Sequence, residues 1–395
     1  MFVYADNAAT TAVSKTALDA MLPCLQEGYG NPSSLYTLGQ QAAEKLSAAR
    51  EIFARNLGAE PREIIFTSGG SEADNQALRT AAALGARRNK KHIVSTAFEH
   101  HAILHTLQAL QKEGFEVTLL PIPENGVVTA QQVKDAIRED TCLVTVMFAN
   151  NEIGTVMPIA EIGAVCHEAG VLFHTDAVQA AGHLPIHVKD MHIDMLSLSA
   201  HKFHGPKGTG VLYARKNIPL TNVIHGGAQE RGKRAGTENV AGICGAAAAF
   251  EEACANMAAN AEKLIPMRDK LIQGLSAIPH SILNGDPVQR LPGNVNFCFE
   301  GIEGESLLLW LDAKGIAASS GSACTSGSLD PSHVLLALGR PHEIAHGSLR
   351  LSLSEYNTPE EVDYIIETVP GIIEYLRNMS PVWDALETGK MPHII

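Results

Sequence analysis

Short β-rich apolar runs alternate with helical patterns between residues 64 and 214, and this alternation constrains the fold more than any other feature of the chain. The runs occupy residues 64–67, 92–96, 117–121, 142–148, 171–176, 194–199 and 210–214. Regular strand–helix alternation predicts an α/β fold with a mainly parallel, seven-stranded sheet wrapped by helices. Because ligands bind such sheets beyond the carboxyl ends of the strands, we expect functional side chains just after these runs.

The composition of the chain changes after residue 245. Residues 246–278 are rich in helix formers and predict one long helix or two joined helices. Strand-like runs at 294–299 and 348–354 then alternate with the helical segments 305–315 and 359–377. These patterns predict a smaller α+β domain that begins near residue 260.

Charge and composition exclude several classes of protein. The 395 residues are 45% hydrophobic and carry a formal net charge of −13, so the chain lacks the basic surface of a nucleic-acid-binding protein. No apolar run approaches the roughly 20 residues that span a bilayer, and the first residues do not resemble a signal peptide. The seven cysteines show no C-x-x-C spacing, which favours a reducing, cytoplasmic setting over a disulfide framework.

Polar residues follow several of the apolar runs. The segment TSGGSEADN (67–75) suits a phosphate cradle at a helix start, although taken alone an ordinary capped turn is the simpler explanation. Asp176 is either a helix cap or a ligand charge, and Lys202 is either a solvated lysine or an amine nucleophile. His100 follows the run 92–96, where a histidine could stack on a flat cofactor or move protons.

Two histidine patterns raise the question of a metal. His101 and His105 share one face of a predicted helix, but no cysteine or carboxylate completes a ligand set at suitable spacing. The segment HEIAH (342–346) has the form of a zinc-protease motif. Pro341 and Gly347 leave it barely one helical turn, so we predict no resident metal.

The strand-end residues are more informative together than alone. A phosphate cradle, a strand-end aspartate, a strand-end lysine and a nearby histidine are the groups expected around pyridoxal phosphate (PLP). A separate feature is Cys324, which lies in the Gly- and Ser-rich stretch 319–333, predicted to be a loop. Gly321 and Gly327 give this stretch backbone freedom, so the cysteine is predicted to move on a tether.

Motifs along essentially the whole chain resemble one enzyme family. They are YADNAATT, GNPSS, FTSGGSEADN, EHHA, NNEIG, HTDAVQ, SAHKFHGPKG, ERGKRAGTENVAG, SSGSACTSG and SLRLSL. Their order resembles that of the NifS/IscS-type cysteine desulfurases of the class V aminotransferase family. The residues of the motif ERGKRAGTENVAG are more similar to NifS than to IscS. The resemblance implies a fold-type I PLP-dependent transferase, with a large PLP-binding domain at 15–260 and a small domain formed by 1–14 and 261–395.

The resemblance also implies residue roles at the cofactor. Lys202 is the Schiff-base lysine, Asp176 pairs with the pyridine nitrogen, and Gln179 bonds the ring hydroxyl. His100 stacks on the ring and handles protons, although the doubled histidine in EHHA leaves the role of His101 open. The phosphate is expected to be held by Gly70, Ser71, Ser199 and His201, together with Thr237, which reaches the cofactor of the partner subunit.

The remaining roles concern the substrate and the sulfur. Asn151 lies at the cofactor and substrate, and Arg350, with Asn31, receives the substrate carboxylate. Cys324 is the nucleophile that takes sulfur from L-cysteine as a persulfide, and it is a possible transient iron–sulfur ligand with a scaffold partner. We expect a homodimer that passes sulfur to an iron–sulfur scaffold or another acceptor protein. A selenocysteine lyase or other PLP lyase, and a non-catalytic scaffold of a sulfur system, are the alternatives.

Overall fold

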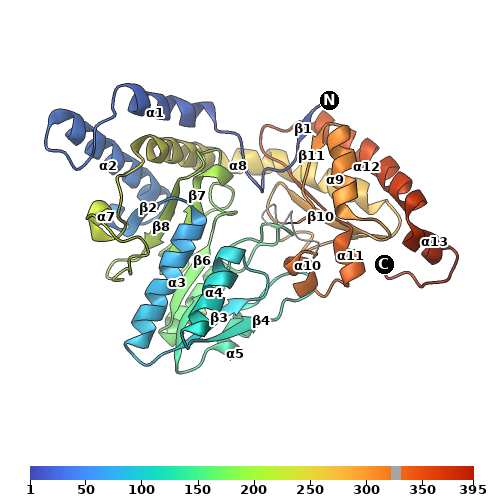
Figure 1. The fold of residues 1–395 in the computed structure, drawn as a ribbon, viewed down its shortest axis with the longest axis horizontal. Helices are drawn as coiled ribbons and strands as arrows, with labels where there is room; N and C mark the ends of the chain where they lie inside the picture. Colours follow the sequence, from blue (N-terminus) through green and yellow to red (C-terminus); the bar gives the residue numbers. More distant parts are fainter. Residues whose placement is uncertain (322–330) are drawn as a thin grey trace.

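The computed structural model describes residues 1–321 and 331–395, which form a large sheet with covering helices beside a smaller α+β unit (Figure 1). The large sheet has the strand order β2-β8-β7-β6-β5-β3-β4. Its strands are β2 (Ile64–Thr67), β3 (His92–Thr96), β4 (Glu116–Leu120), β5 (Thr141–Thr145), β6 (Leu172–Asp176), β7 (Met195–Ser199) and β8 (Gly210–Ala214). Only β8 runs antiparallel to its neighbours, so the predicted mainly parallel, seven-stranded sheet is confirmed.

Burial explains why these runs form strands. Every residue of β2, β3, β5, β7 and β8 is buried, as expected for strands covered on both faces, whereas the edge strand β4 is largely open to solvent. The crossover helices lie between the strands in sequence. They are α3 (Gly70–Ala86), α4 (His101–Lys112), α5 (Ala130–Ala136) and α6 (Ile159–Ala169).

One continuous helix, α8 (Val240–Ser276), joins the large sheet to the smaller unit (Figure 1). It begins at Asn239, whose side chain accepts a hydrogen bond from Gly242 N at 3.0 Å. Helices α1 (Lys15–Gln26) and α2 (Thr37–Leu57) pack against it, and α7 (Gln229–Gly232) precedes it. The helix passes through residue 260, so the expected domain division there remains a prediction.

The smaller unit combines the C-terminal third of the chain with the N-terminus. Its antiparallel sheet has the order β12-β10-β9, and β1 (Val3–Tyr4) pairs in parallel with β11 (Ile316–Ala317). The remaining strands are β9 (Ser281–Leu283), β10 (Asn294–Phe299) and β12 (Ser348–Ser352). Its helices are α9 (Gly304–Ala313), α10 (His333–Ala337), α11 (His342–His346), α12 (Pro359–Met379) and α13 (Pro381–Glu387).

The smaller unit has a hydrophobic core that is separate from the core of the large sheet. Val3 and Ala5 belong to it together with residues of α8, α9, β10, β12 and α12. The N-terminal segment is therefore fixed to the C-terminal part of the chain, and its next residues continue toward the large sheet. Among residues 1–321 and 331–395, no helix combines the length and apolarity that a bilayer-spanning segment needs.

Candidate active site

A cavity of about 200 Å³ lies at the carboxyl ends of the strands of the large sheet. Strand β6 ends at Asp176 and strand β7 at Ser199, so the chain itself places these side chains at the rim of the sheet. Ten of the predicted site residues line this one cavity: Gly70, Ser71, His100, Asn151, Asp176, Gln179, Ser199, His201, Lys202 and Arg350.

The first turn of α3 forms one wall of the cavity. Gly70 and Ser71 begin this 17-residue helix, whose free N–H groups suit an anion. A Cβ atom on Gly70 would lie 2.6 Å from Val178 Cγ2, so a glycine is required for the helix to approach the segment after β6 this closely. The wall therefore has the shape and the hydrogen-bond donors of a phosphate cradle, which the phosphate group of PLP would need.

Lys202 ends the short 3₁₀ turn Ala200–Lys202, directly after β7. Its Nζ atom donates hydrogen bonds to Ala8 O at 2.6 Å and Ala9 O at 2.7 Å. Gln179 Nε2 donates to the same Ala8 oxygen at 2.9 Å. The N-terminal segment is thus part of the cavity wall and orients the lysine, a role that the sequence motif YADNAATT did not reveal.

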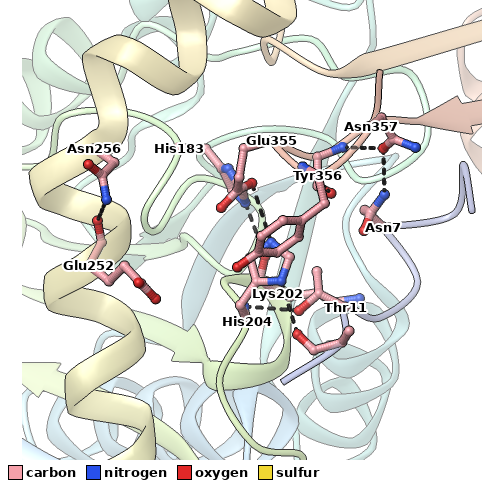
Figure 2. A network of polar contacts seen from close by, with 12 residues as sticks. Asn7, Thr11, His183, Lys202, His204, Glu252, Asn256, Glu355, Tyr356 and Asn357 are labelled. Atoms are coloured by element: carbon pink, nitrogen blue, oxygen red, sulfur yellow. Dashed lines mark hydrogen bonds and ion pairs between the residues drawn. The ribbon is translucent and has the colours of Figure 1, made fainter. Parts of the chain in front are cut away.

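A polar network lies behind Lys202 and fixes its main chain (Figure 2). His183 Nε2 lies 3.0 Å from Lys202 O, and His204 N donates to Thr11 Oγ1 at 2.9 Å. His204 Nε2 also lies 3.3 Å from Glu355 Oε2. Burial acts to lower the pKa of His204, but the Glu355 carboxylate outweighs it and raises that pKa above its usual value.

Asp176 stands at the end of β6 and is 6% exposed. Its Oδ1 atom accepts a hydrogen bond from Val178 N at 2.9 Å. Burial raises the pKa of this carboxyl, while His100, when its ring is protonated, and Lys202 act in the opposite direction. A buried carboxyl in this position suits a cationic partner such as a protonated ring nitrogen.

His100 and His101 have different surroundings. His100 caps the start of α4, where its Nδ1 atom accepts from Ala102 N at 3.1 Å, and its ring lines the cavity. The His101 ring instead packs against His333 at 4.6 Å and His105 at 5.0 Å between ring centroids. Burial, followed by the neighbouring histidines, lowers the pKa of His101 to about 4. Of the two histidines in EHHA, His100 is the one that lines the cavity.

Arg350 reaches the cavity from β12 of the smaller unit. Its Nη2 atom donates to Asp6 Oδ1 at 2.7 Å, and its Nη1 atom donates to Asn151 O at 3.0 Å. The sequence motifs suggested no role for Asp6, although it belongs to YADNAATT. The fold brings this aspartate next to Arg350.

Three predicted residues are not among those that line the cavity. Thr237 and Asn31 are exposed, and the Asn31 side chain accepts a local hydrogen bond from Ser33 N at 2.9 Å. Cys324 lies in 322–330, outside the described residues. Beyond this segment, Ser332 Oγ donates a hydrogen bond to Glu152 Oε2.

Sequence reasoning missed one ionisable residue of the cavity wall. Asp74 lines the cavity from α3 and is 1% exposed. Its position was visible in the motif GSEADN, because Asp74 follows Gly70 by four residues and so lies on the same helix face. Further lining residues without a predicted role are Ala8, Ala9, Met147, Ala149 and Val178.

Comparison with known proteins identifies the family. The model of the aminotransferase class-V family matches residues 3–365 of this chain. The chain belongs to this family. It is 56% identical to cysteine desulfurase IscS of Clostridium botulinum, over 97% of each chain. It is also 56% identical to cysteine desulfurase IscS of Methanosarcina thermophila, over 96% of this chain and 94% of that protein.

Solved structures of NifS-like proteins share the fold. A NifS-like protein superposes with a TM-score of 0.89 at 40% identity, over 95% of this chain and 100% of that one. This similarity confirms the predicted fold-type I architecture and the resemblance to the NifS/IscS-type enzymes. The chain is therefore an enzyme of the cysteine desulfurase type within the aminotransferase class-V family.

Proposed function

We propose that this class-V enzyme is a PLP-dependent cysteine desulfurase, which converts L-cysteine to L-alanine and leaves the sulfur on Cys324 as a persulfide. One observation carries the proposal. Lys202, Asp176 and His100 converge on a single cavity whose other wall is the N-terminus of α3. An amine, a buried carboxylate, an imidazole and a phosphate cradle are the groups that PLP chemistry uses.

The residues of the cavity divide into groups that would hold different parts of PLP. Lys202 would attach to the aldehyde carbon, Asp176 would face the ring nitrogen, and Gln179 would face the ring hydroxyl. The phosphate would lie at Gly70, Ser71, Ser199 and His201, with Thr237 contributed across a dimer interface. When bound, PLP supplies an electron sink that stabilises negative charge on the substrate Cα atom.

The chain's own residues bind the substrate and move its protons. Arg350, beside Asn151, would bind the substrate carboxylate. Lys202 Nζ lies between two main-chain oxygens, which hold it at the cavity wall as the group that removes the Cα proton. His100 Nδ1 is engaged by Ala102 N, so the neutral ring carries its proton on Nε2, from which it can be donated.

The sulfur step balances without a further oxidant. Free cysteine and the Cys324 thiol give alanine and the Cys324 persulfide, with one sulfur atom transferred and one C–S bond exchanged for one S–S bond. The attacking species is the thiolate of Cys324. The persulfide would then pass its sulfur to an iron–sulfur scaffold or another acceptor protein.

We also propose that the enzyme is a cytoplasmic homodimer with a large domain at 15–260 and a small domain at 1–14 and 261–395. Large apolar side chains near the start of α2 are open to solvent, as expected of a surface that a second subunit covers. Tyr29, Leu35 and Tyr36 are 72%, 91% and 61% exposed. Sedimentation of the purified protein would measure the oligomeric state, and a monomer would contradict the role given to Thr237.

Product analysis tests the proposed reaction. The enzyme is incubated with L-cysteine and a reductant, and alanine and sulfide are measured. Wild type should release both in equal amounts, Lys202→Ala should lose the cofactor absorption band, and Cys324→Ala should keep the band but release no sulfide. Cys254→Ala serves as the matched cysteine control and should retain activity.

The alternatives give different product patterns. Alanine release from selenocysteine but not from cysteine would identify a selenocysteine lyase. A wild-type protein without a cofactor band would identify a non-catalytic scaffold. Desulfurase activity that persists in Cys324→Ala would overturn the persulfide assignment.

A further inference from the structure

Two aspartates from different elements share the cavity. Asp74 comes from α3 and Asp176 from the end of β6, and both line the cavity. Their carboxylate oxygens and a ring nitrogen of His100 lie within 4.8 Å of one another. Two carboxylates this close in a buried site repel each other, so one of them tends to retain a proton.

The charges around the two aspartates are not equal. Asp176 is influenced by the positive charge of Lys202, and by His100 when its ring is protonated. Asp74 instead lies within ion-pair distance of His174, because the Nε2 atom of His174 is 3.7 Å from Asp74 Oδ1. Burial lowers the pKa of His174 to about 3, so this ring is neutral near pH 7 and cannot compensate a charged Asp74.

Both ring nitrogens of His174 already have hydrogen-bond partners within the protein. Its Nδ1 atom lies 2.9 Å from Thr145 Oγ1, and its Nε2 atom lies 3.0 Å from Ser197 Oγ. Asp74 Oδ1 is fully buried and has no hydrogen-bond partner among the residues that the structure describes. Burying an ionised carboxylate whose oxygen has no hydrogen-bond partner costs much free energy, whereas burying a neutral carboxylic acid costs much less.

The neighbouring acidic residues also favour the protonated form of Asp74. Burial raises the pKa of Asp74 well above its usual value, Asp176 and Glu99 add to this effect, and the nearby Ser197 hydroxyl opposes it. Glu99 is itself buried, which raises its pKa to about 8. Three carboxyl groups therefore face one buried region, and Lys202 and His100 act mainly on Asp176.

We propose that Asp74 is a positioning residue that keeps a proton in the folded enzyme and thereby confines the negative charge of the cavity to Asp176. This inference deepens the proposed function and rests on it, because a single charge on Asp176 is what a cationic ring nitrogen requires. A charged Asp74 would offer the cofactor a second carboxylate and would compete for the charge of Lys202.

Infrared spectroscopy of the cofactor-free protein measures the protonation state directly. A protonated carboxyl has a C=O stretching band that is resolved from the bands of carboxylates. The difference spectrum between wild type and Asp74→Asn near neutral pH should show one protonated carboxyl band lost in the variant. Glu99→Gln is the matched control, and it should remove a different band of the same kind. A spectrum in which Asp74→Asn loses only carboxylate bands overturns the proposal.

Cofactor binding supplies a second readout. PLP affinity is measured for the cofactor-free wild type, Asp74→Asn and Asp74→Ala across the pH range in which the protein is stable. Asparagine mimics a neutral aspartic acid in shape, so its affinity should stay within about threefold of wild type, with the same pH profile. Alanine should weaken binding by more than about tenfold because it leaves a gap beside Asp176 and Ser197.

The outcomes separate this inference from the proposed function. If Asp74 were charged, Asp74→Asn would move the pH profile of binding by about one unit or more, since a unit charge so close to Asp176 would be removed. Such a shift, or an Asp74→Ala variant that binds like wild type, contradicts the role given to Asp74. If wild type itself binds no PLP, the proposed function fails, and the infrared measurement still decides the state of Asp74.

Discussion

Arg350 and Asp6 form a buried ion pair at the wall of the cavity, with 2.7 Å between Nη2 and Oδ1. The Arg350 side chain is 1% exposed, and its Nη1 atom donates to Asn151 O. The Nε atom of Arg350 has no hydrogen-bond partner within the described part of the chain. The guanidinium is therefore held in place by the protein, while N–H donors that these two hydrogen bonds do not use remain for a substrate carboxylate.

Replacing Arg350 by lysine tests this role. A lysine keeps the positive charge but cannot bond Asp6, Asn151 and a substrate together, so Arg350→Lys should raise the KM for L-cysteine by more than about tenfold. The cofactor absorption band should be unchanged. Arg340→Lys is the matched control, because Arg340 bonds Asn284 and Glu124 and does not line the cavity. An unchanged KM in Arg350→Lys would remove the arginine from substrate binding.

The two adjacent histidines should differ sharply in their contribution to turnover. His100 lines the cavity, so His100→Ala should lower kcat by about 100-fold or more, the usual contribution of a general acid or base. His101 packs against His105 and His333 instead, and His101→Ala should stay within about threefold of wild type. Steady-state kinetics of both variants checks this, and the reverse order would assign the cofactor to His101.

Glu99 should make the folded protein less stable as pH rises. Its folded pKa of about 8 lies above the value of about 4.5 for an exposed glutamate, so between these values the folded state holds a proton that the unfolded state has lost. Stability should then fall with rising pH in this window, by at most about 1.4 kcal/mol per pH unit from this group.

A glutamine variant isolates the contribution of Glu99. Glu99→Gln keeps an oxygen that accepts from Thr96 Oγ1 and Met147 N but cannot ionise. Its thermal midpoint relative to wild type should therefore be higher near pH 8 than near pH 5. Glu27→Gln, at an exposed position, is the control. A difference from wild type that is the same at both pH values would show that Glu99 does not titrate in this range.

Glu230 holds the segment before α8 against the large sheet. Its carboxylate accepts two hydrogen bonds from Arg50, at 2.7 and 2.8 Å, and one from Phe66 N at 2.9 Å. Glu230→Gln leaves a largely buried guanidinium without its counter-charge and should destabilise the protein by about 3 kcal/mol. Thermal unfolding measures the loss.

The proposed dimer offers a second readout of the Glu230 contact. The segment that follows Glu230 contains Thr237, which we expect at the cofactor of a second subunit, so Glu230→Gln should also weaken dimerisation. Glu251→Gln breaks the exposed pair with Arg55 and should cost about 0–1 kcal/mol. Equal effects of the two variants would contradict a special role for the buried pair.

The strands and several site residues could be predicted from the sequence because their signals are local. Each apolar run corresponds to a strand. Asp176 and Ser199 are the last residues of such runs, and Lys202 follows Ser199 by three residues. Once the runs form a parallel sheet, their carboxyl ends must meet at one edge, so these side chains converge without further information. The family motifs added Arg350, which periodicity alone did not assign.

The class of fold and the strand-end residues of the site could be inferred from the sequence alone, because burial and alternation act over a few neighbouring residues, and the motifs indicated the family. The distant groups that complete the cavity are brought together by tertiary packing. Ala8 accepts from Lys202 across 194 residues, and Asp6 binds Arg350 across 344. Asp74 became a partner of Asp176 only when α3 packed beside β6. Such contacts depend on the relative placement of whole elements, which the local pattern of apolar and polar residues does not encode.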